Sequence, residues 1–254
     1  MIRVLAAMLV LLCAPAFGAD RLVQVETRPG VKLGYWWMER PGAAATLVLL
    51  PGGEGVIGMR EGIPQSTNFL VRTRDEFAAA GYNVAILGRP SDRTTQDAVW
   101  RTSADHLTDL RAIVGDLKKQ SKAPVWLVGT SRGTYSAATG GIGLEPGSIA
   151  GIVLTSTITD ALRVTTVPNM ALAEIRVPVL IVHHEKDACL SCPARLVPPM
   201  MERLTNAPVK KLVMVNGGSG ASGDPCEALH WHGFIGMEKE AVGIITAWIR
   251  KPVK

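Results

Sequence analysis

The residues best suited to chemistry are the five from Gly129 to Gly133, which read Gly-Thr-Ser-Arg-Gly and follow the apolar run 125–128 directly. A Gly-x-Ser-x-Gly pattern between a strand and a helix is typical of a nucleophile elbow, a sharp turn that raises a serine hydroxyl above the edge of a sheet. Glycines are needed at both ends because strand and helix cross so closely that a Cβ would collide there. The pattern therefore predicts Ser131 as a nucleophile.

An activated serine needs a general base, and the base needs an acid that orients it. In doubly wound sheets these groups gather at the carboxyl ends of the strands. Asp187 follows the apolar run 177–182 closely and lies where a loop residue can turn back over the sheet edge. We predict Asp187 as the acid, with Glu185 and Asp160 as the competing carboxylates.

The five histidines differ in their positions relative to the predicted elements. His232 precedes a Gly-Phe turn that can present an imidazole, so we predict it as the base, with His230 as its competitor. His183 and His184 leave their strand too early and are expected to pack or to form hydrogen bonds. His106 lies within a predicted helix, where we expect a surface or core-edge residue. The resulting chain order of serine, acid and histidine is the one expected for this arrangement.

Acyl transfer by serine also requires hydrogen-bond donors for the developing oxyanion. The segment Pro51-Gly52-Gly53 follows the apolar run 45–50 and offers backbone N–H groups at the end of that strand. We predict one donor from Gly53, with Glu54 as the alternative. The other donor is expected from Arg132, the residue after the nucleophile.

A mostly parallel sheet is needed to bring these residues together. Strands are expected at 21–27, 32–39, 45–50, 82–87, 123–128, 149–155, 177–182 and 209–215, and helices at 68–80, 101–119, 193–204 and 238–251. Strands that alternate with helices after an opening antiparallel hairpin predict an α/β fold with helices on both faces of the sheet. The two strands at 149–155 and 177–182 are separated by only about twenty residues, which leaves no room for a large lid domain.

The start of the 254-residue chain has the features of a signal peptide at residues 1–18. Arg3 supplies a charge, an apolar stretch follows, and small residues precede the expected cleavage after Gly18, with Ala16 and Ala19 as alternative sites. The apolar stretch is too short for a transmembrane anchor. We therefore expect a periplasmic or secreted protein without stable membrane insertion, in which residues 19–254 form one domain.

Three cysteines follow the predicted signal peptide, and in an oxidising compartment a disulfide is the expected state. Cys189 lies two residues after the predicted acid, and Cys226 lies six residues before the predicted base. We predict a bridge between these two, which would tie the two loops together and leave Cys192 free. A bridge between Cys192 and Cys226 stays open as the alternative.

Taken together, these motifs resemble the α/β-hydrolase superfamily over nearly all of the chain after residue 18. More narrowly, the chain is similar to small exported bacterial members of undefined substrate, through the blocks at Asn68–Arg72, His183–Cys189 and Pro225–Phe234. The resemblance implies a serine hydrolase, although the superfamily also includes non-catalytic members. The family usually has a histidine where Pro51 stands, so this chain keeps the backbone donors but lacks one side chain that braces their loop.

The predicted activity is hydrolysis of a small ester or related acyl compound through an acyl-enzyme, and the triad does not choose among esters, thioesters, lactones and amides. Arg132, Arg72 and Asn68 favour an acidic substrate if they face the pocket, but not if they pack elsewhere. The only expected partner is the small-molecule substrate. Basic residues are interleaved with acids in a chain of net charge +5, so no nucleic-acid footprint is predicted.

Other classes of function have weaker support. A non-catalytic binding or interaction protein is the first alternative. A thiol-disulfide oxidoreductase would use Cys189-Leu-Ser-Cys192 at a helix start. The run Gly53-x-Gly55-x-x-Gly58 matches a dinucleotide fingerprint only formally, because Gly62 and Pro64 interrupt the required helix. Zinc would need Cys189, Cys192, Cys226 and His230, which lack regular spacing. We predict no cofactor and no metal.

Overall fold

A computed structural model describes residues 19–160 and 165–254 of the protein. The predicted signal peptide at residues 1–18 lies outside the described residues. Within the described part of the chain, no helix is both long and apolar enough to cross a membrane.

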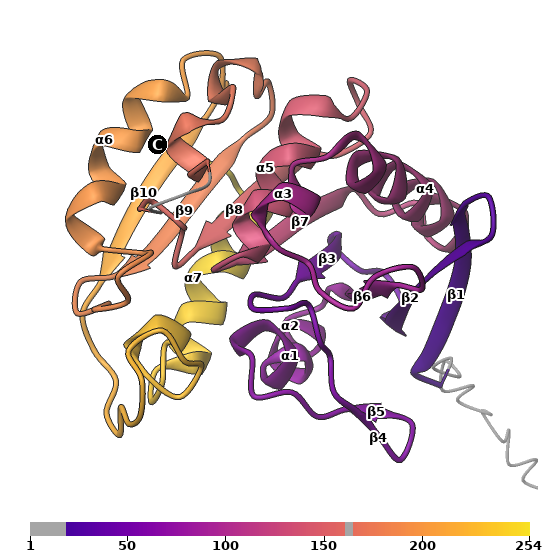
Figure 1. Ribbon diagram of the computed structural model, residues 1–254, viewed down its shortest axis with the longest axis horizontal. Coiled ribbons are helices and arrows are strands. Elements are labelled where there is room, and N and C mark those ends of the chain that lie inside the picture. The colour runs from indigo at the N-terminus through magenta and orange to yellow at the C-terminus, as the bar shows by residue number, and fades with distance from the viewer. Residues whose placement is uncertain (1–18, 161–164) are drawn as a thin grey trace, which may run out of the picture.

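An eight-stranded sheet is the centre of the fold, with strand order β1-β2-β6-β3-β7-β8-β9-β10 (Figure 1). The strands are β1 (Arg21–Arg28), β2 (Val31–Met38), β3 (Thr46–Leu50), β6 (Asn83–Pro90), β7 (Val125–Thr130), β8 (Gly151–Thr155), β9 (Val179–His184) and β10 (Lys210–Val215). β1 and β2 form an antiparallel hairpin, β2 also pairs with β6 in antiparallel orientation, and the remaining pairs are parallel. The predicted α/β fold is therefore confirmed.

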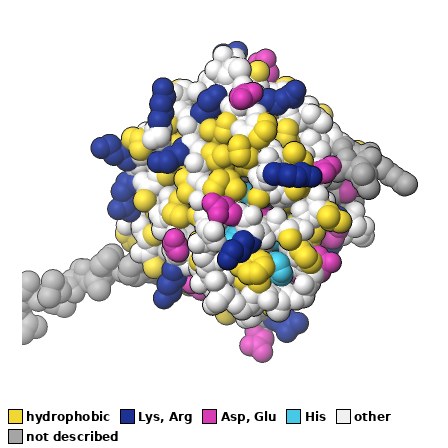
Figure 2. All heavy atoms as spheres, turned by 90° about the vertical axis from the view of Figure 1, so that its left-hand side faces the viewer, with side chains coloured by type: hydrophobic (Ala, Val, Ile, Leu, Met, Phe, Trp, Pro, Cys, Tyr) yellow, Lys and Arg dark blue, Asp and Glu magenta, His cyan; other side chains and the backbone are white. Residues whose placement is uncertain are grey.

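The central strands are apolar on both sides because both faces of the sheet are covered. Every residue of β3, β7, β8 and β9 is buried, which explains why these strands read as continuous apolar runs. β10 is the outer strand on one side, and its residues 210–214 are partly exposed. Figure 2 shows the face on this side of the molecule, where Lys and Arg side chains are scattered rather than gathered in one patch.

Helices pack on both faces of the sheet and divide the core into two clusters. On one face lie α3 (Ala98–Arg101), α4 (Ala104–Gln120), α5 (Gly133–Gly143) and α6 (Val197–Arg203); on the other lie α1 (Phe69–Arg72), α2 (Arg74–Ala79) and α7 (Glu238–Arg250). The first cluster includes Ile113 of α4 and Met200 of α6. The second includes Phe77 of α2 and Ile245 of α7.

The structure differs from the sequence prediction in three elements, the first being the separate short helix α3 ahead of the helix expected at 101–119. The helix expected at 68–80 is divided into α1 and α2 at Thr73, whose hydroxyl donates a hydrogen bond to Phe69 O at 2.7 Å. A side-chain bond of this kind to the preceding turn competes with the regular helical pattern. A small unpredicted hairpin, β4 (Met59–Arg60) with β5 (Ile63–Pro64), follows the glycine-rich run that formally matches a dinucleotide fingerprint. The fingerprint requires a helix there, so the structure does not support it.

Several connections over the carboxyl edge of the sheet contain short 3-10 helices. Between β8 and β9 the described residues form two short 3-10 helices, η1 (Val167–Asn169) and η2 (Leu172–Glu174). Two more, η3 (Ala194–Leu196) and η4 (Trp231–Gly233), lie after β9 and before α7. The described residues therefore include no lid domain, as predicted.

A buried ion pair joins the N-terminal hairpin to α4. Asp109 has a fully buried carboxylate, which accepts hydrogen bonds from Thr27 Oγ1 at 2.6 Å and from Arg28 Nε at 2.8 Å. The hydrogen bonds from Arg28 to Asp109 and Asp92 raise the pKa of the Arg28 guanidinium. Since hairpin and helix are far apart in sequence, this carboxylate fixes how the first strand lies against α4.

Replacing Asp109 by Asn should therefore destabilise the protein. The amide of Asn accepts the two hydrogen bonds from Arg28 more weakly than the carboxylate, while Arg28 keeps Asp92 as a partner at 3.0 Å. We therefore expect Asp109→Asn to lower the free energy of unfolding in urea by about 2 kcal/mol. Asp105→Asn is the matched control, because the Asp105 side chain is 59% exposed and lies 3.8 Å from the same arginine. The control should lose less than about 1 kcal/mol. Equal losses in the two variants would contradict the assignment.

Candidate active site

Ser131 stands between β7 and α5 in a strained conformation, with a positive φ of 52°. A Cβ on Gly129 would lie 2.3 Å from Gly133 O, and a Cβ on Gly133 would lie 1.9 Å from Leu50 O. Backbone therefore occupies the space that side chains at either position would need. Strain of this kind persists only where the surroundings enforce it, which is common at functional sites.

The imidazole of His232 bridges Asp187 and the pocket that Ser131 lines. His232 Nδ1 lies 2.9 Å from Asp187 Oδ2, and the ring is almost fully buried. His232 Nε2 has no hydrogen-bond partner among the described residues. Ser131 and His232 line the same pocket. Within the described part of the chain they are not hydrogen-bonded to each other, and such contacts often tighten only when a substrate binds.

Asp187 is buried in the loop after β9 and is held on several sides. Its Oδ1 accepts a hydrogen bond from Cys189 N–H at 3.0 Å, and its own N–H donates to His184 O at 3.0 Å. Its Oδ2, which faces His232, also lies 3.5 Å from His183 Nε2. The carboxylate therefore has one orientation, with a single oxygen directed at the imidazole of His232.

His183 braces this acid loop. Its Nδ1 accepts a hydrogen bond from Thr157 N–H at 3.3 Å, so in the neutral ring Nε2 carries the proton and donates to Cys192 O at 2.9 Å. Burial lowers the pKa of His183, although the charge of Asp187 opposes that shift. With both ring nitrogens occupied, His183 cannot accept a proton from Ser131.

His184, the next residue, also braces the loops around it. Its Nδ1 accepts from Lys186 N–H at 3.0 Å, and its Nε2 lies 3.0 Å from Gly217 O in the loop after β10. The prediction that these two histidines form hydrogen bonds is confirmed. They nevertheless belong to the end of β9 rather than to the loop that follows it.

The competing acids and bases lie elsewhere. Glu185 accepts a hydrogen bond from Asn216 Nδ2 at 2.7 Å, and Asp160 is exposed after β8. The His230 ring packs edge-on against Trp231, with ring centroids 4.8 Å apart. The prediction of a surface or core-edge position for His106 is wrong, because this residue is buried, and burial lowers its pKa to about 3. None of them reaches the Ser131 pocket.

Two residues whose contacts the sequence did not predict, Ser156 and Arg72, position the His232 loop. Ser156 has a positive φ of 45°, and its hydroxyl donates to His232 O at 2.7 Å. Arg72 donates to Gly233 O at 2.6 Å and forms an ion pair with Glu238 at 3.0 Å. Of the two residues, only Arg72 lies in a segment that the sequence singled out, the block Asn68–Arg72 that resembles the family. Neither hydrogen bond to the His232 loop was predicted.

The predicted oxyanion donors also line the pocket. Gly53 and Arg132 both contribute to its wall beside Ser131. Neither backbone N–H has a hydrogen-bond acceptor among residues 19–160 and 165–254. The Arg132 side chain is 43% exposed and forms an ion pair with Glu54, so its charge is compensated rather than packed away against a helix.

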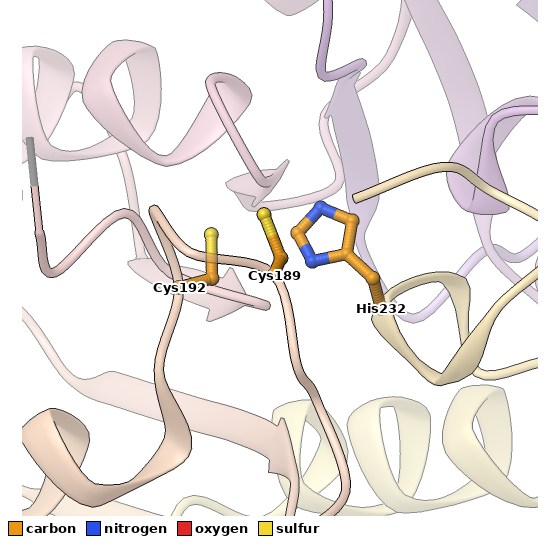
Figure 3. A group of neighbouring side chains, drawn as sticks. All are labelled: Cys189, Cys192 and His232. Carbon is orange, nitrogen blue, oxygen red and sulfur yellow. The ribbon is translucent and has the colours of Figure 1, made fainter. Parts of the chain in front are cut away.

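A disulfide joins the Asp187 loop to the His232 loop, because Cys189 is bonded to Cys226 as predicted. Figure 3 shows Cys189 and Cys192 on one loop with the His232 ring beside Cys189, and the ligand atoms of these three residues lie within 4.8 Å of one another. The disulfide sulfur of Cys189 is not a thiolate ligand. The cluster thus offers two ligands, fewer than the four of a structural zinc site.

The buried Cys192 thiol is the one free cysteine of the described residues. Burial raises its pKa well above the ordinary value, and the charge of Asp187 raises it further. A redox-active C-x-x-C motif requires the opposite shift, toward a thiolate at neutral pH.

The pocket around Ser131 has a volume of about 560 Å³ and mixed walls. Val56, Phe69 and Ile158 supply apolar surface, and Asn68 and Ser191 supply polar groups. Volumes of this size suit small-molecule ligands.

The sequence matches no model of a protein family and no curated protein. Solved structures with similar folds include a dienelactone hydrolase from Anabaena variabilis (16% identity, TM-score 0.63, covering 93% of this chain and 99% of that one). They also include a cold-adapted esterase from an Arctic intertidal metagenomic library (16% identity, TM-score 0.59, covering 92% and 94%). A lidless serine hydrolase from Xanthomonas campestris is likewise similar (16% identity, TM-score 0.57, covering 94% and 99%). The chain thus has the fold of the α/β-hydrolase superfamily.

Proposed function

We propose that the protein is a serine hydrolase that cleaves a small ester or related acyl substrate. One observation carries the proposal: His232 Nδ1 is held by Asp187 at 2.9 Å, while His232 Nε2 is buried, unpartnered among the described residues and on the wall of the Ser131 pocket. A free, oriented imidazole nitrogen beside a strained serine is the requirement for an activated nucleophile.

In the proposed mechanism, His232 Nε2 takes the proton of Ser131 Oγ as the oxygen attacks the substrate carbonyl. Asp187 keeps the Nδ1–H tautomer and stabilises the imidazolium that forms. The N–H groups of Gly53 and Arg132 receive the oxyanion. The imidazolium then protonates the leaving group, and water activated by the same histidine hydrolyses the acyl-enzyme.

The charges around the pocket favour an uncharged substrate. The Arg132 side chain is paired with Glu54, and Arg72 is directed to Gly233 O and Glu238 instead of the pocket. No unpaired cation among the lining residues is thus available for an acidic group. We propose that the substrate is a small neutral acyl compound. Assays with esters, thioesters, lactones and amides would identify which of these classes is cleaved.

We also propose that the protein is exported, by the signal peptide predicted at residues 1–18, to the periplasm or the medium. The disulfide between Cys189 and Cys226 supports this, because such bonds persist in oxidising compartments.

The first test removes the nucleophile. Ser131→Ala should lower kcat for a simple aryl ester by about 10³-fold or more, because the variant lacks the hydroxyl oxygen that attacks the substrate carbonyl. It should also abolish labelling by a fluorophosphonate. Ser148→Ala, outside the pocket, is the matched control and should keep both properties. Full turnover by Ser131→Ala would remove the central claim, and wild-type protein that resists the reagent would favour the non-catalytic alternative.

The second test separates the two histidines of the same loop. His232→Ala should abolish turnover, whereas His230→Ala should change it little, because of these two histidines His232 alone contacts Asp187. Since a protonated imidazole cannot accept the serine proton, acidification should lower the wild-type rate. A reversed ranking of the two variants would show that the base is wrongly assigned.

The third test concerns the disulfide, which spans 37 positions and contributes about 3–4 kcal/mol by the chain-entropy model. Reduction frees the Asp187 loop from the His232 loop, so kcat should fall at reductant concentrations and temperatures where circular dichroism still shows a folded protein. Cys226→Ser should reproduce this loss without reductant, and Ser148→Ala, outside the pocket, serves as the control that keeps the bond. Activity that persists until global unfolding would contradict a positioning effect.

A further inference from the structure

Arg101, at the end of α3, is a buried arginine without an acidic partner. Arg101 is only 2% exposed, and no carboxylate of the described chain forms an ion pair with it. Burial and the nearby charge of Arg132 lower its pKa to about 9, so the guanidinium remains charged at neutral pH. Burying a charge without a counter-ion is costly, so hydrogen bonds must compensate for it.

Those hydrogen bonds reach the loop that carries the proposed oxyanion donor. Arg101 Nη2 donates to Pro51 O at 3.0 Å and lies 3.5 Å from Gly53 O. Its Nε donates to Gln96 O at 2.9 Å, and its Nη1 donates to Ser136 Oγ at 2.8 Å. One planar group thus joins the loop after β3 to α5, the helix that begins after the nucleophile.

These contacts determine where the N–H groups of the loop point. In a planar trans peptide, the C=O and N–H bonds point in opposite directions, so holding a carbonyl fixes the next residue's N–H. Arg101 holds the carbonyls of Pro51 and Gly53, on either side of the Gly52–Gly53 peptide. The carbonyl of that middle peptide, Gly52 O, accepts a hydrogen bond from Gly55 N–H at 3.1 Å. Three consecutive peptide groups are thereby held, and the Gly53 N–H has one direction.

The rigid fork of arginine suits this task, because it presents several donors in fixed geometry. Pro51 has no polar side chain that could brace the loop from within. Arg101 holds the loop instead, by donating hydrogen bonds to its carbonyl groups from the buried end of α3.

We propose that Arg101 is a positioning residue that holds residues 51–53 so that the Gly53 N–H faces the oxyanion formed at Ser131. This inference rests on the proposed hydrolase function. It places Arg101 outside the set of groups that touch the substrate, so its loss should weaken binding of the transition state and leave substrate binding nearly unchanged.

The test compares 4-nitrophenyl butyrate hydrolysis with inhibition by butylboronic acid, which forms a tetrahedral anionic adduct on serine. Arg101→Gln should lower kcat by about 30–100-fold, the cost of a misplaced oxyanion donor, and leave KM within about twofold. The inhibition constant of the boronic acid should rise by the same factor. The pH profile should keep its midpoint, because the contact between His232 and Asp187 is untouched.

Arg101→Lys keeps the charge and one donor but not the fork, so we expect a loss of about tenfold in both measurements. Ser136→Ala removes only the acceptor on α5 and should give a smaller loss of the same kind. Arg111→Gln, at an exposed arginine of α4 paired with Glu145, is the matched control and should behave as wild type.

An Arg101→Gln variant that is folded, with kcat and boronic acid inhibition within about twofold of wild type, would overturn the inference. If that variant does not fold, Arg101→Lys and Ser136→Ala decide by the same criterion. A parallel assay of Ser131→Ala separates the two levels of the argument. Turnover that survives loss of Ser131 would remove the hydrolase proposal, whereas turnover that needs Ser131 but not Arg101 would remove only this inference.

Discussion

The buried carboxylate of Asp187 is the constraint on which the rest of the site depends. A charged group can occupy the interior only if hydrogen bonds replace its lost hydration. The chain supplies these from its own loop and from His232, 45 positions away, with His183 alongside. The need to satisfy this carboxylate therefore brings together the carboxyl end of β9 and the loop before α7. It also determines which nitrogen of His232 is left without a partner at the pocket that Ser131 lines.

Much of the fold was predictable because its signals are local. Buried parallel strands appear as apolar runs, and the turn at Ser131 is marked by the glycines at 129 and 133. The sheet, most of the helices and the place of Ser131 between a strand and a helix could therefore be predicted. Asp187 and His232 could be predicted as the acid and the histidine near Ser131, because their order in the chain and their places after predicted strands leave few competing residues.

The residues that support the site could not be predicted in the same way. Ser156 reaches His232 across 76 positions, and Arg101 reaches Pro51 across 50. Such contacts depend on how loops cross in three dimensions, and a single sequence carries no local pattern for them. His106 shows the reverse error, since its place in a helix predicted some exposure while the packing of α4 buried it. Burial of a polar group is decided by the neighbouring elements, not by the helix that carries it.

The disulfide has a consequence for the open side of the sheet. The chain between Cys189 and Cys226 contains α6 and β10, the outermost strand. This segment is therefore a closed covalent ring whose two ends meet next to the candidate active site. An edge strand normally offers unpaired backbone groups to other molecules and is the region of a sheet most easily peeled away. Here β10 can separate from β9 only as far as the ring allows, so the bond that joins two loops also limits exchange of this strand with another copy of the chain.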